Sequence, residues 1–226
     1  MLLHLIPIIV IGTISLAIII ERAYALYWKF PINNYRFLAE IKQKVLSNDV
    51  GTAIQICANQ NNTLCASVVK GGLLRASRDN KQIQATLEIL AHEAIATARK
   101  RIAYLAMFAN VATLFGLLGT IAGLIKAFAA VANVDAATKS ILLAEGISTS
   151  MNATAAGLLV AIPSMIAFSI LQSKANRIIE DIENAAMVTM DLLSTRLYRD
   201  EWDDMGNPKN KAIPPVITMS DKNKAA

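Results

Sequence analysis

The 226-residue sequence has few glycines, prolines and aromatic residues, and only two cysteines. Ten glycines and six prolines are too few for a fibrous or low-complexity chain, and 6% aromatic residues provide little for the aromatic girdles of an outer-membrane β-barrel. Charged residues make up 17% of the chain, whereas soluble domains usually contain about 25%. With 54% hydrophobic residues and a mean hydropathy of +0.43, the composition favours a membrane protein that crosses the bilayer with helices.

The sequence also lacks the motifs of metal sites and of common enzymes. Cys57 and Cys65 have no His or Cys neighbours at metal-ligand spacing, which indicates reduced thiols, and His4 and His92 are isolated. There is no GxSxG, Walker or HExxH motif. We therefore expect no enzymatic activity, no cofactor and no metal ion.

Three apolar stretches are long enough to span a bilayer, which takes about 20 residues. The first lacks the preceding positive charge and the cleavage site of a signal peptide, so we interpret it as an uncleaved span. The second contains one charge, Lys126, near its far end, and the third contains Glu145 near its start and Pro163 inside it. The predicted transmembrane helices are residues 1–20, 102–132 and 141–171.

Lysine and arginine predict the orientation of these spans. Twelve of them lie between the first and second spans, including Arg99, Lys100 and Arg101 at the membrane edge, whereas Lys139 is the one basic residue in the short link 133–140. The positive-inside rule then places the N-terminus and this link in the periplasm. We interpret the net charge of +5 as this topology signal, and not as a nucleic-acid site.

The region between the first two spans, residues 21–101, is predicted to be a helical cytoplasmic domain. Apolar residues recur every three or four positions over residues 35–45 and 83–98, as on amphipathic helices. A similar stripe after the third span predicts a helical extension over 172–202, ending near Trp202. Residues 203–226 have no such face, so we expect a disordered cytoplasmic tail. The predicted fold class is all-α.

Small and hydroxylated residues form stripes inside the second and third spans. Thr113 and Thr120 are seven residues apart and so return to nearly the same helical face, close to Gly116 and Gly123. The third span carries one such stripe and, on the predicted opposite side, a polar patch. The stripe comprises Ser150, Thr154, Gly157, Ala161 and Ser164, and the patch comprises Glu145, Ser148, Thr149 and Asn152.

Two interpretations of these stripes stay open on the residues alone. Small residues at this spacing allow tight helix packing in lipid, and each hydroxyl can bond its own backbone. Alternatively, the hydroxyls line a narrow polar path for an ion, with Thr113, Thr120, Thr149, Ser150, Asn152 and Thr154 as candidate pathway residues. Glu145 lies near the outer end of its span, which favours a solvated carboxylate.

Two longer motifs resemble a known family. The segment from Phe115 to Phe128, FGLLGTIAGLIKAF, is followed by LAEGI at 143–147 and by ATAAGLLVAIP at 153–163. Together with Glu21-Arg22 after the first span, they resemble the MotA/TolQ/ExbB proton-channel family, and the order of spans and loops is similar over nearly the whole chain except the tail.

The resemblance implies an inner-membrane motor subunit driven by the proton motive force. It implies a ring-shaped homopentamer around two copies of a single-span partner similar to ExbD, TolR or MotB, which carries an aspartate in its span. Thr120 and Thr154 match the family's pore threonines. TolQ and ExbB-like members carry a glutamate where this chain has Thr149, which is more similar to the gliding-motility branch, and Glu145 one turn earlier is a hypothetical substitute.

Two other functional classes compete with this interpretation. A structural membrane scaffold would use the small residues for packing alone. A secondary transporter is disfavoured because the chain has no internal repeat and few spans. The choice between H⁺ and Na⁺ and the process that is powered stay open, because both depend on the partner.

Overall fold

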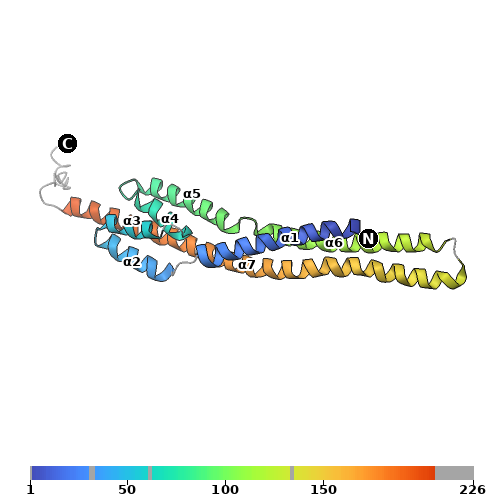
Figure 1. Cartoon of the computed structure of the whole chain (residues 1–226). Coiled ribbons are helices and arrows are strands. Elements are labelled where there is room, and N and C mark those ends of the chain that lie inside the picture. Colours follow the sequence, from blue (N-terminus) through green and yellow to red (C-terminus); the bar gives the residue numbers. More distant parts are fainter. Residues whose placement is uncertain (1, 31–33, 61–62, 133–134, 207–226) are drawn as a thin grey trace, which may run out of the picture.

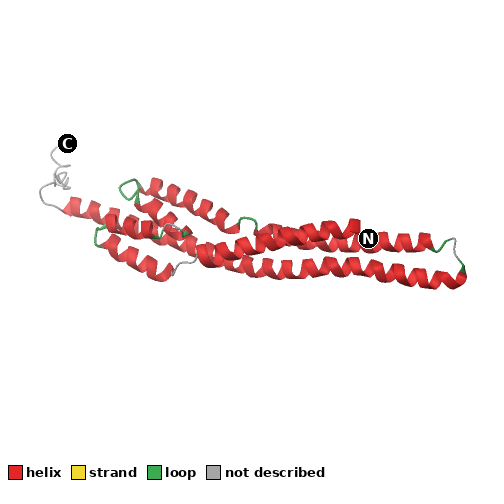
Figure 2. Ribbon diagram, in the orientation of Figure 1, coloured by secondary structure: helices red, strands yellow, loops and turns green. Residues whose placement is uncertain are grey.

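The computed structural model describes residues 2–30, 34–60, 63–132 and 135–206, and all regular elements in these ranges are helices (Figure 2). They follow one another as α1 (Leu2–Tyr24), η1 (Ala25–Lys29, a π-helical turn), α2 (Asn34–Leu46), α3 (Val50–Asn59), α4 (Leu64–Leu73), α5 (Asn80–Arg99), α6 (Ile102–Ala130) and α7 (Ala136–Gly206). The predicted all-α class is therefore confirmed.

The molecule is elongated and has two parts (Figure 1). At one end α1 packs along the hairpin of α6 and α7, and this hairpin extends beyond the N-terminus of α1. At the other end α2, α3, α4 and α5 gather around the second half of α7. Three helical stretches are long and apolar enough to cross a membrane, and each overlaps one of the predicted spans: Ile6–Lys29, Asn80–Ala130 and Thr138–Tyr198.

Helix α7 extends beyond the predicted third span at both ends. It begins at Ala136, so residues 136–140 of the predicted link are helical, because the carbonyl of Asp135 accepts the first helical bonds from the amides of Thr138 and Lys139. The same helix runs to Gly206, four residues beyond Trp202, where glycine is a common helix end, so residues 203–206 of the predicted tail are helical too. Residues 133–134 of the predicted link and 207–226 of the predicted tail lie outside the described residues.

Small side chains let α1, α6 and α7 approach one another. Their shared buried cluster consists of Ile11, Ala109, Ala112 and Ala161. A Cβ added to Gly157 would lie 2.7 Å from the carbonyl oxygen of Ala112, so α6 and α7 touch backbone to backbone at this level. The larger apolar side chains of α6 and α7, among them Leu117 and Leu159, point outward. This distribution matches helices that pack through small residues in lipid.

A buried pair of serines joins α1 to α7. The hydroxyls of Ser15 and Ser164 are 2.7 Å apart, and the Ser164 hydroxyl also donates to the carbonyl of Val160 at 2.7 Å. Each hydroxyl has one hydrogen, so the Ser15 hydroxyl donates to Ser164. This contact fixes the register of α1 against α7.

The second half of α7 forms the core of the other end. The apolar stripes predicted on residues 83–98 and 178–193 meet there, and Leu87, Ile182, Ala185 and Leu193 are buried in one cluster with residues of α2, α3 and α4. Gly72 brings α4 close to α5 and α7, because a Cβ there would lie 2.7 Å from Leu87 Cδ2 and 3.1 Å from Thr189 Cγ2. The helices therefore bury the faces that the periodicity indicates.

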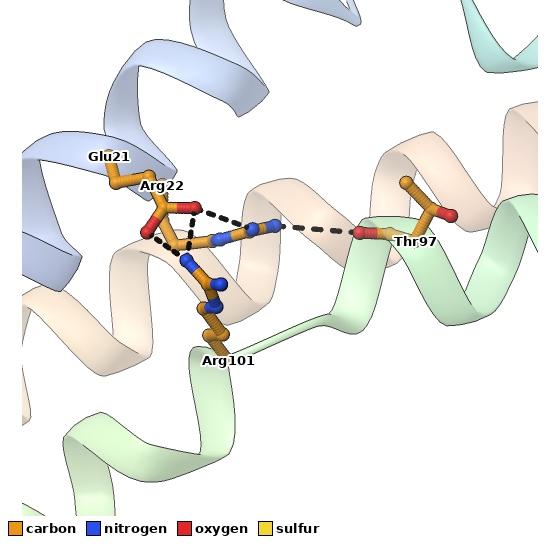
Figure 3. A network of polar contacts seen from close by, with 4 residues as sticks. All are labelled: Glu21, Arg22, Thr97 and Arg101. Carbon is orange, nitrogen blue, oxygen red and sulfur yellow. Dashed lines mark hydrogen bonds and ion pairs between the residues drawn. The ribbon is translucent and has the colours of Figure 1, made fainter.

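Charged residues connect the two parts where α1 passes the start of α6 (Figure 3). Arg101, between α5 and α6, has a left-handed backbone with φ 63°, and its guanidinium donates to both carboxylate oxygens of Glu21 at 2.6 and 2.8 Å. The buried Arg22 donates to Glu21 at 3.0 Å and to the carbonyl of Thr97 at 3.5 Å. One carboxylate thus bridges an exposed and a buried arginine.

Candidate ion pathway

Thr120 of α6 and Thr154 of α7 face each other across the two helices, and their hydroxyls are in direct contact. The backbone carbonyls of Gly116 and Ser150 lie beside them. The Thr120 hydroxyl is 3.2 Å from the Gly116 oxygen and 3.3 Å from the Ser150 oxygen, and the Thr154 hydroxyl is 3.2 Å from the Gly116 oxygen. Four oxygens therefore gather between two otherwise apolar helices.

This cluster has two possible directions of hydrogen bonding. Each hydroxyl has one hydrogen and can accept others. When Thr120 donates to Thr154, Thr154 donates to the Gly116 carbonyl. When Thr154 donates to Thr120, Thr120 donates to the carbonyl of Gly116 or Ser150. A cluster that can reverse its direction without gaining a charge has the property needed to relay a hydrogen bond.

Glycines bring the two threonines together. A Cβ on Gly116 would lie 3.2 Å from the Ala153 oxygen and 3.2 Å from the Thr154 Cα, so the backbones of α6 and α7 approach closely one turn below Thr120. Gly157, one turn beyond Thr154, faces Gly116 in the same way. The small-residue stripes and the hydroxyl contact are thus one structural unit.

A cleft of about 320 Å³ lies between α6 and α7 on the side of the threonine pair toward the hairpin tip. Its polar lining includes Lys126 of α6 and, from α7, Glu145, Thr149 and the buried Ser150. The Ser150 hydroxyl donates to the Gly146 carbonyl at 2.7 Å, while its own carbonyl faces Thr120. The cleft therefore leads toward the threonine cluster.

The structure corrects the predicted polar patch. Glu145 and Thr149 line the same cleft as Ser150 and so lie toward α6, not on the opposite side of α7. The other two members, Ser148 and Asn152, are exposed and do not line this cleft. At about 100° per residue, Ser148 lies about 60° to 100° around the helix from Glu145 and Thr149, and Asn152 about 20° to 60°, so both turn toward the exposed side of α7.

Thr113 and Asn152 are not part of the cluster in this chain. Thr113 is exposed and its hydroxyl donates to the carbonyl of Ala109 in its own helix at 3.0 Å. The carbonyls of Gly116 and Ser150 belong to the threonine cluster but could not be predicted from the sequence, because a side-chain pattern carries no information on backbone acceptors. Nor could the contact of Ser15 be predicted, since a lone serine in a first span gives no signal of its partner.

Three helical stretches long and apolar enough to cross a membrane, packed through glycines around a pair of hydroxyls, define the class of this protein as a helical membrane protein. The MotA/TolQ/ExbB proton channel family model matches residues 59–184, more than half of the chain. The chain belongs to this family. The match contains α4, α5, α6 and most of α7 up to Asn184, including both threonines.

Two curated proteins are similar to parts of the chain. The "Tol-Pal system protein TolQ" of Haemophilus influenzae is 34% identical over 108 residues, which cover 48% of this chain and 45% of that protein. The "Biopolymer transport protein exbB1" of Vibrio cholerae is 36% identical over 80 residues, 35% of each chain. The chain thus spans less than half the length of either relative.

Proposed function

We propose that this chain is the pore-forming subunit of an inner-membrane motor that couples the proton motive force to mechanical work in the cell envelope. The observation that carries the proposal is the contact between the Thr120 and Thr154 hydroxyls, since the resemblance to the family assigns its pore threonines to these two positions. The names of the relatives support a role in a Tol-Pal system or in biopolymer transport, that is, in envelope maintenance or import. Surface motility is the third process that such a motor can power.

The threonine pair would relay protons and not store them. A hydroxyl stays neutral at every physiological pH, so the group that takes up and releases the proton must come from elsewhere. We assign that role to an aspartate in the span of a partner similar to ExbD, TolR or MotB. One proton moving through 100 mV supplies about 2.3 kcal/mol, so a useful stroke needs several protons. A ring of identical subunits, each with its own threonine pair, supplies them in sequence.

The assembly we propose is a homopentamer around two partner spans, with the N-terminus in the periplasm and the end of α7 in the cytoplasm. The outward-facing apolar side chains of α6 and α7 support an assembly or a lipid contact on these faces. Arg99, Lys100 and Arg101 at the junction of α5 and α6 support the orientation. The proposed spans are 1–20, 102–132 and the part of α7 from 141 to 171.

The test replaces each threonine by valine, which keeps the shape and removes the hydroxyl. We expect Thr120→Val and Thr154→Val each to reduce proton flux at least tenfold in vesicles that contain the chain with its partner, while the native mass of the complex stays the same. Thr113→Val is the matched control, because its hydroxyl bonds only within α6. Normal flux in both pathway variants would remove the relay role.

A structural scaffold is the second candidate, favoured by the close approach of Gly116 and Gly157. On that hypothesis the hydroxyls satisfy themselves on nearby carbonyls and conduct nothing. It predicts that Gly116→Leu disrupts the assembly while both valine variants keep full envelope function. The two hypotheses therefore differ in the outcome of the same threonine substitutions.

A further inference from the structure

A groove between α5 and α7 is lined by apolar and acidic side chains. It has a volume of about 690 Å³, its apolar lining includes Leu87, Met187 and Met190, and its carboxylates are those of Glu88, Glu183 and Asp191. None of the described residues that line it is a lysine or an arginine. Met187 is 65% exposed, a large apolar surface for the side chain of a helix outside the predicted spans. The groove thus presents the chemistry of a binding site for a basic and apolar segment.

The end of this chain has the complementary composition. Residues 212–219, AIPPVITM, are apolar and are flanked by lysine pairs at Lys209 and Lys211 and at Lys222 and Lys224. Residues 207–226 contain four lysines and one acidic residue, Asp221. Two successive prolines favour the extended polyproline conformation, which loses little entropy on docking. We propose that residues 207–226 dock into the groove between α5 and α7 of their own chain.

The length of the segment fits the position of the groove. The groove residues of α7 run from Ser194 to Glu183, which are 12 and 23 residues before the helix end at Gly206. At 1.5 Å per residue they lie about 18 and 35 Å back along the helix. A polyproline segment that turns back rises about 3.1 Å per residue, so residues 212 and 219 reach about 19 and 40 Å. The apolar stretch therefore covers the groove, with a lysine pair at each end.

The sequence between helix and segment favours such a turn. Gly206 is followed by Asn207 and Pro208, a combination that ends helices and reverses the chain. Docking would cover the apolar lining of the groove around Met187 and would place lysines beside its carboxylates. This site is separate from the proposed ion pathway, because Thr154 precedes Glu183, the first groove residue of α7, by 29 residues, about 44 Å of helix.

The first test measures the alkylation of a cysteine in the groove. Met187→Cys is introduced in the full chain, in its complex in native membranes, and its rate with a maleimide is compared with that in a chain ending at Gly206. We expect the full chain to react at least fivefold more slowly. The matched control is Ile89→Cys, which replaces a side chain 67% exposed on α5 that does not line the groove, and which should react equally in both chains. The native thiols should not interfere, because burial raises the pKa of Cys57 to about 11 and that of Cys65 to about 12.

The second test distinguishes docking of residues 207–226 of the same chain from docking of another chain. Lys209→Glu with Lys211→Glu in the full chain should raise the Met187→Cys rate toward that of the shortened chain, whereas the same lysines changed to arginine should not. Cysteines at Ser194 and Ala212 should form a disulfide within one chain, seen as a monomer on a denaturing gel. Equal Met187→Cys rates with and without residues 207–226 would overturn the proposal, as would a Ser194–Ala212 disulfide found between two chains.

Discussion

At the scale of single residues, the backbone conformation of Arg101 costs stability, whereas its side chain contributes to stability. Its left-handed backbone, φ 63°, breaks the helical path between α5 and α6, and this conformation costs a non-glycine residue about 1 kcal/mol or more. Its guanidinium binds Glu21 at an exposed site, where water and salt screen the ion pair and leave it a small contribution to stability. The side chain therefore offsets part of the strain that its own Cβ causes.

This balance predicts different effects of two substitutions at Arg101. Arg101→Ala keeps the strained backbone and loses the ion pair, whereas Arg101→Gly loses the pair but relieves the strain. We expect the glycine variant to be more stable than the alanine variant by about 1 kcal/mol. Thermal unfolding of the detergent-purified protein measures the difference. Equal melting temperatures would mean that the backbone at position 101 relaxes when the guanidinium is removed.

Glu145 provides a second prediction at this scale. The side chain is exposed and shares its cleft with Lys126 and with Thr149, the position to which the family resemblance assigns a glutamate. A carboxylate in contact with water is not required for a relay that begins at Thr120. We expect Glu145→Gln to leave proton flux within about twofold of the wild type, measured in the same vesicles as the threonine variants. Complete loss of flux would assign the glutamate's role to Glu145.

At the scale of helices, backbone contacts and side-chain contacts tolerate change differently. A Cβ on Gly157 would meet the Ala112 carbonyl at 2.7 Å, and a Cβ on Gly12 would meet the Val160 Cγ2 at 3.1 Å. A valine side chain can move by a few tenths of an ångström, whereas a carbonyl held in α6 cannot move without displacing its helix. The pair α6 and α7 is therefore the rigid unit, and α1 is the more adaptable neighbour.

We accordingly expect Gly157→Ala to destabilise the protein by about 1–3 kcal/mol and to lower proton flux by separating Thr120 from Thr154. Gly12→Ala should cost less than about 1 kcal/mol and leave flux unchanged. Thermal unfolding and flux assays on both variants provide the comparison. If Gly12→Ala proves the more harmful, the position of α1, and not the contact between α6 and α7, controls the threonine pair.

The hydrogen bond between Ser15 and Ser164 contributes to the packing of α1 against α7. Hydrogen bonds between helices in membrane proteins average about 0.6 kcal/mol in double-mutant cycles. Because Ser164 already donates to Val160, Ser15→Ala leaves that donor satisfied, and after Ser164→Ala the Ser15 hydroxyl can donate to a carbonyl of its own helix. We expect a coupling of about 0.6 kcal/mol in a thermal unfolding cycle of Ser15→Ala and Ser164→Ala. A coupling above about 2 kcal/mol would show that neither hydroxyl finds another partner.

At the scale of the whole molecule, the sequence predicts which face of each helix is buried, but it does not predict which residues of two helices contact each other. The apolar periodicity of residues 83–98 and 178–193 defines buried faces, because burial repeats with the helical turn. The same periodicity groups Thr113 with Thr120, although a seven-residue spacing drifts by about 20°, and the Thr113 hydroxyl bonds within α6 whereas that of Thr120 meets Thr154. The family resemblance singles out Thr120 and Thr154, but it does not predict their contact, because a stripe on one helix does not specify which stripe of another helix it meets.

The outward faces of α6 and α7 lead to the last prediction. Leu114, Leu117, Leu118, Ile121 and Ile125 on α6 are all exposed in the single chain, as are Leu158, Leu159, Ile162 and Ile166 on α7. Lipid can cover such side chains on one face of the helix pair. A ring of five subunits would bury them against the two neighbouring subunits and place the face at the centre of the ring against the partner spans. Native mass measurement of the complex extracted from its own membranes should therefore give five copies of this chain with two of a single-span protein that carries an aspartate in its span. Because this result depends on assembly and not on flux, it separates the motor from a scaffold that packs without a partner. A monomer or dimer would mean that lipid alone covers these faces, and the relay between Thr120 and Thr154 would then have no pore to serve.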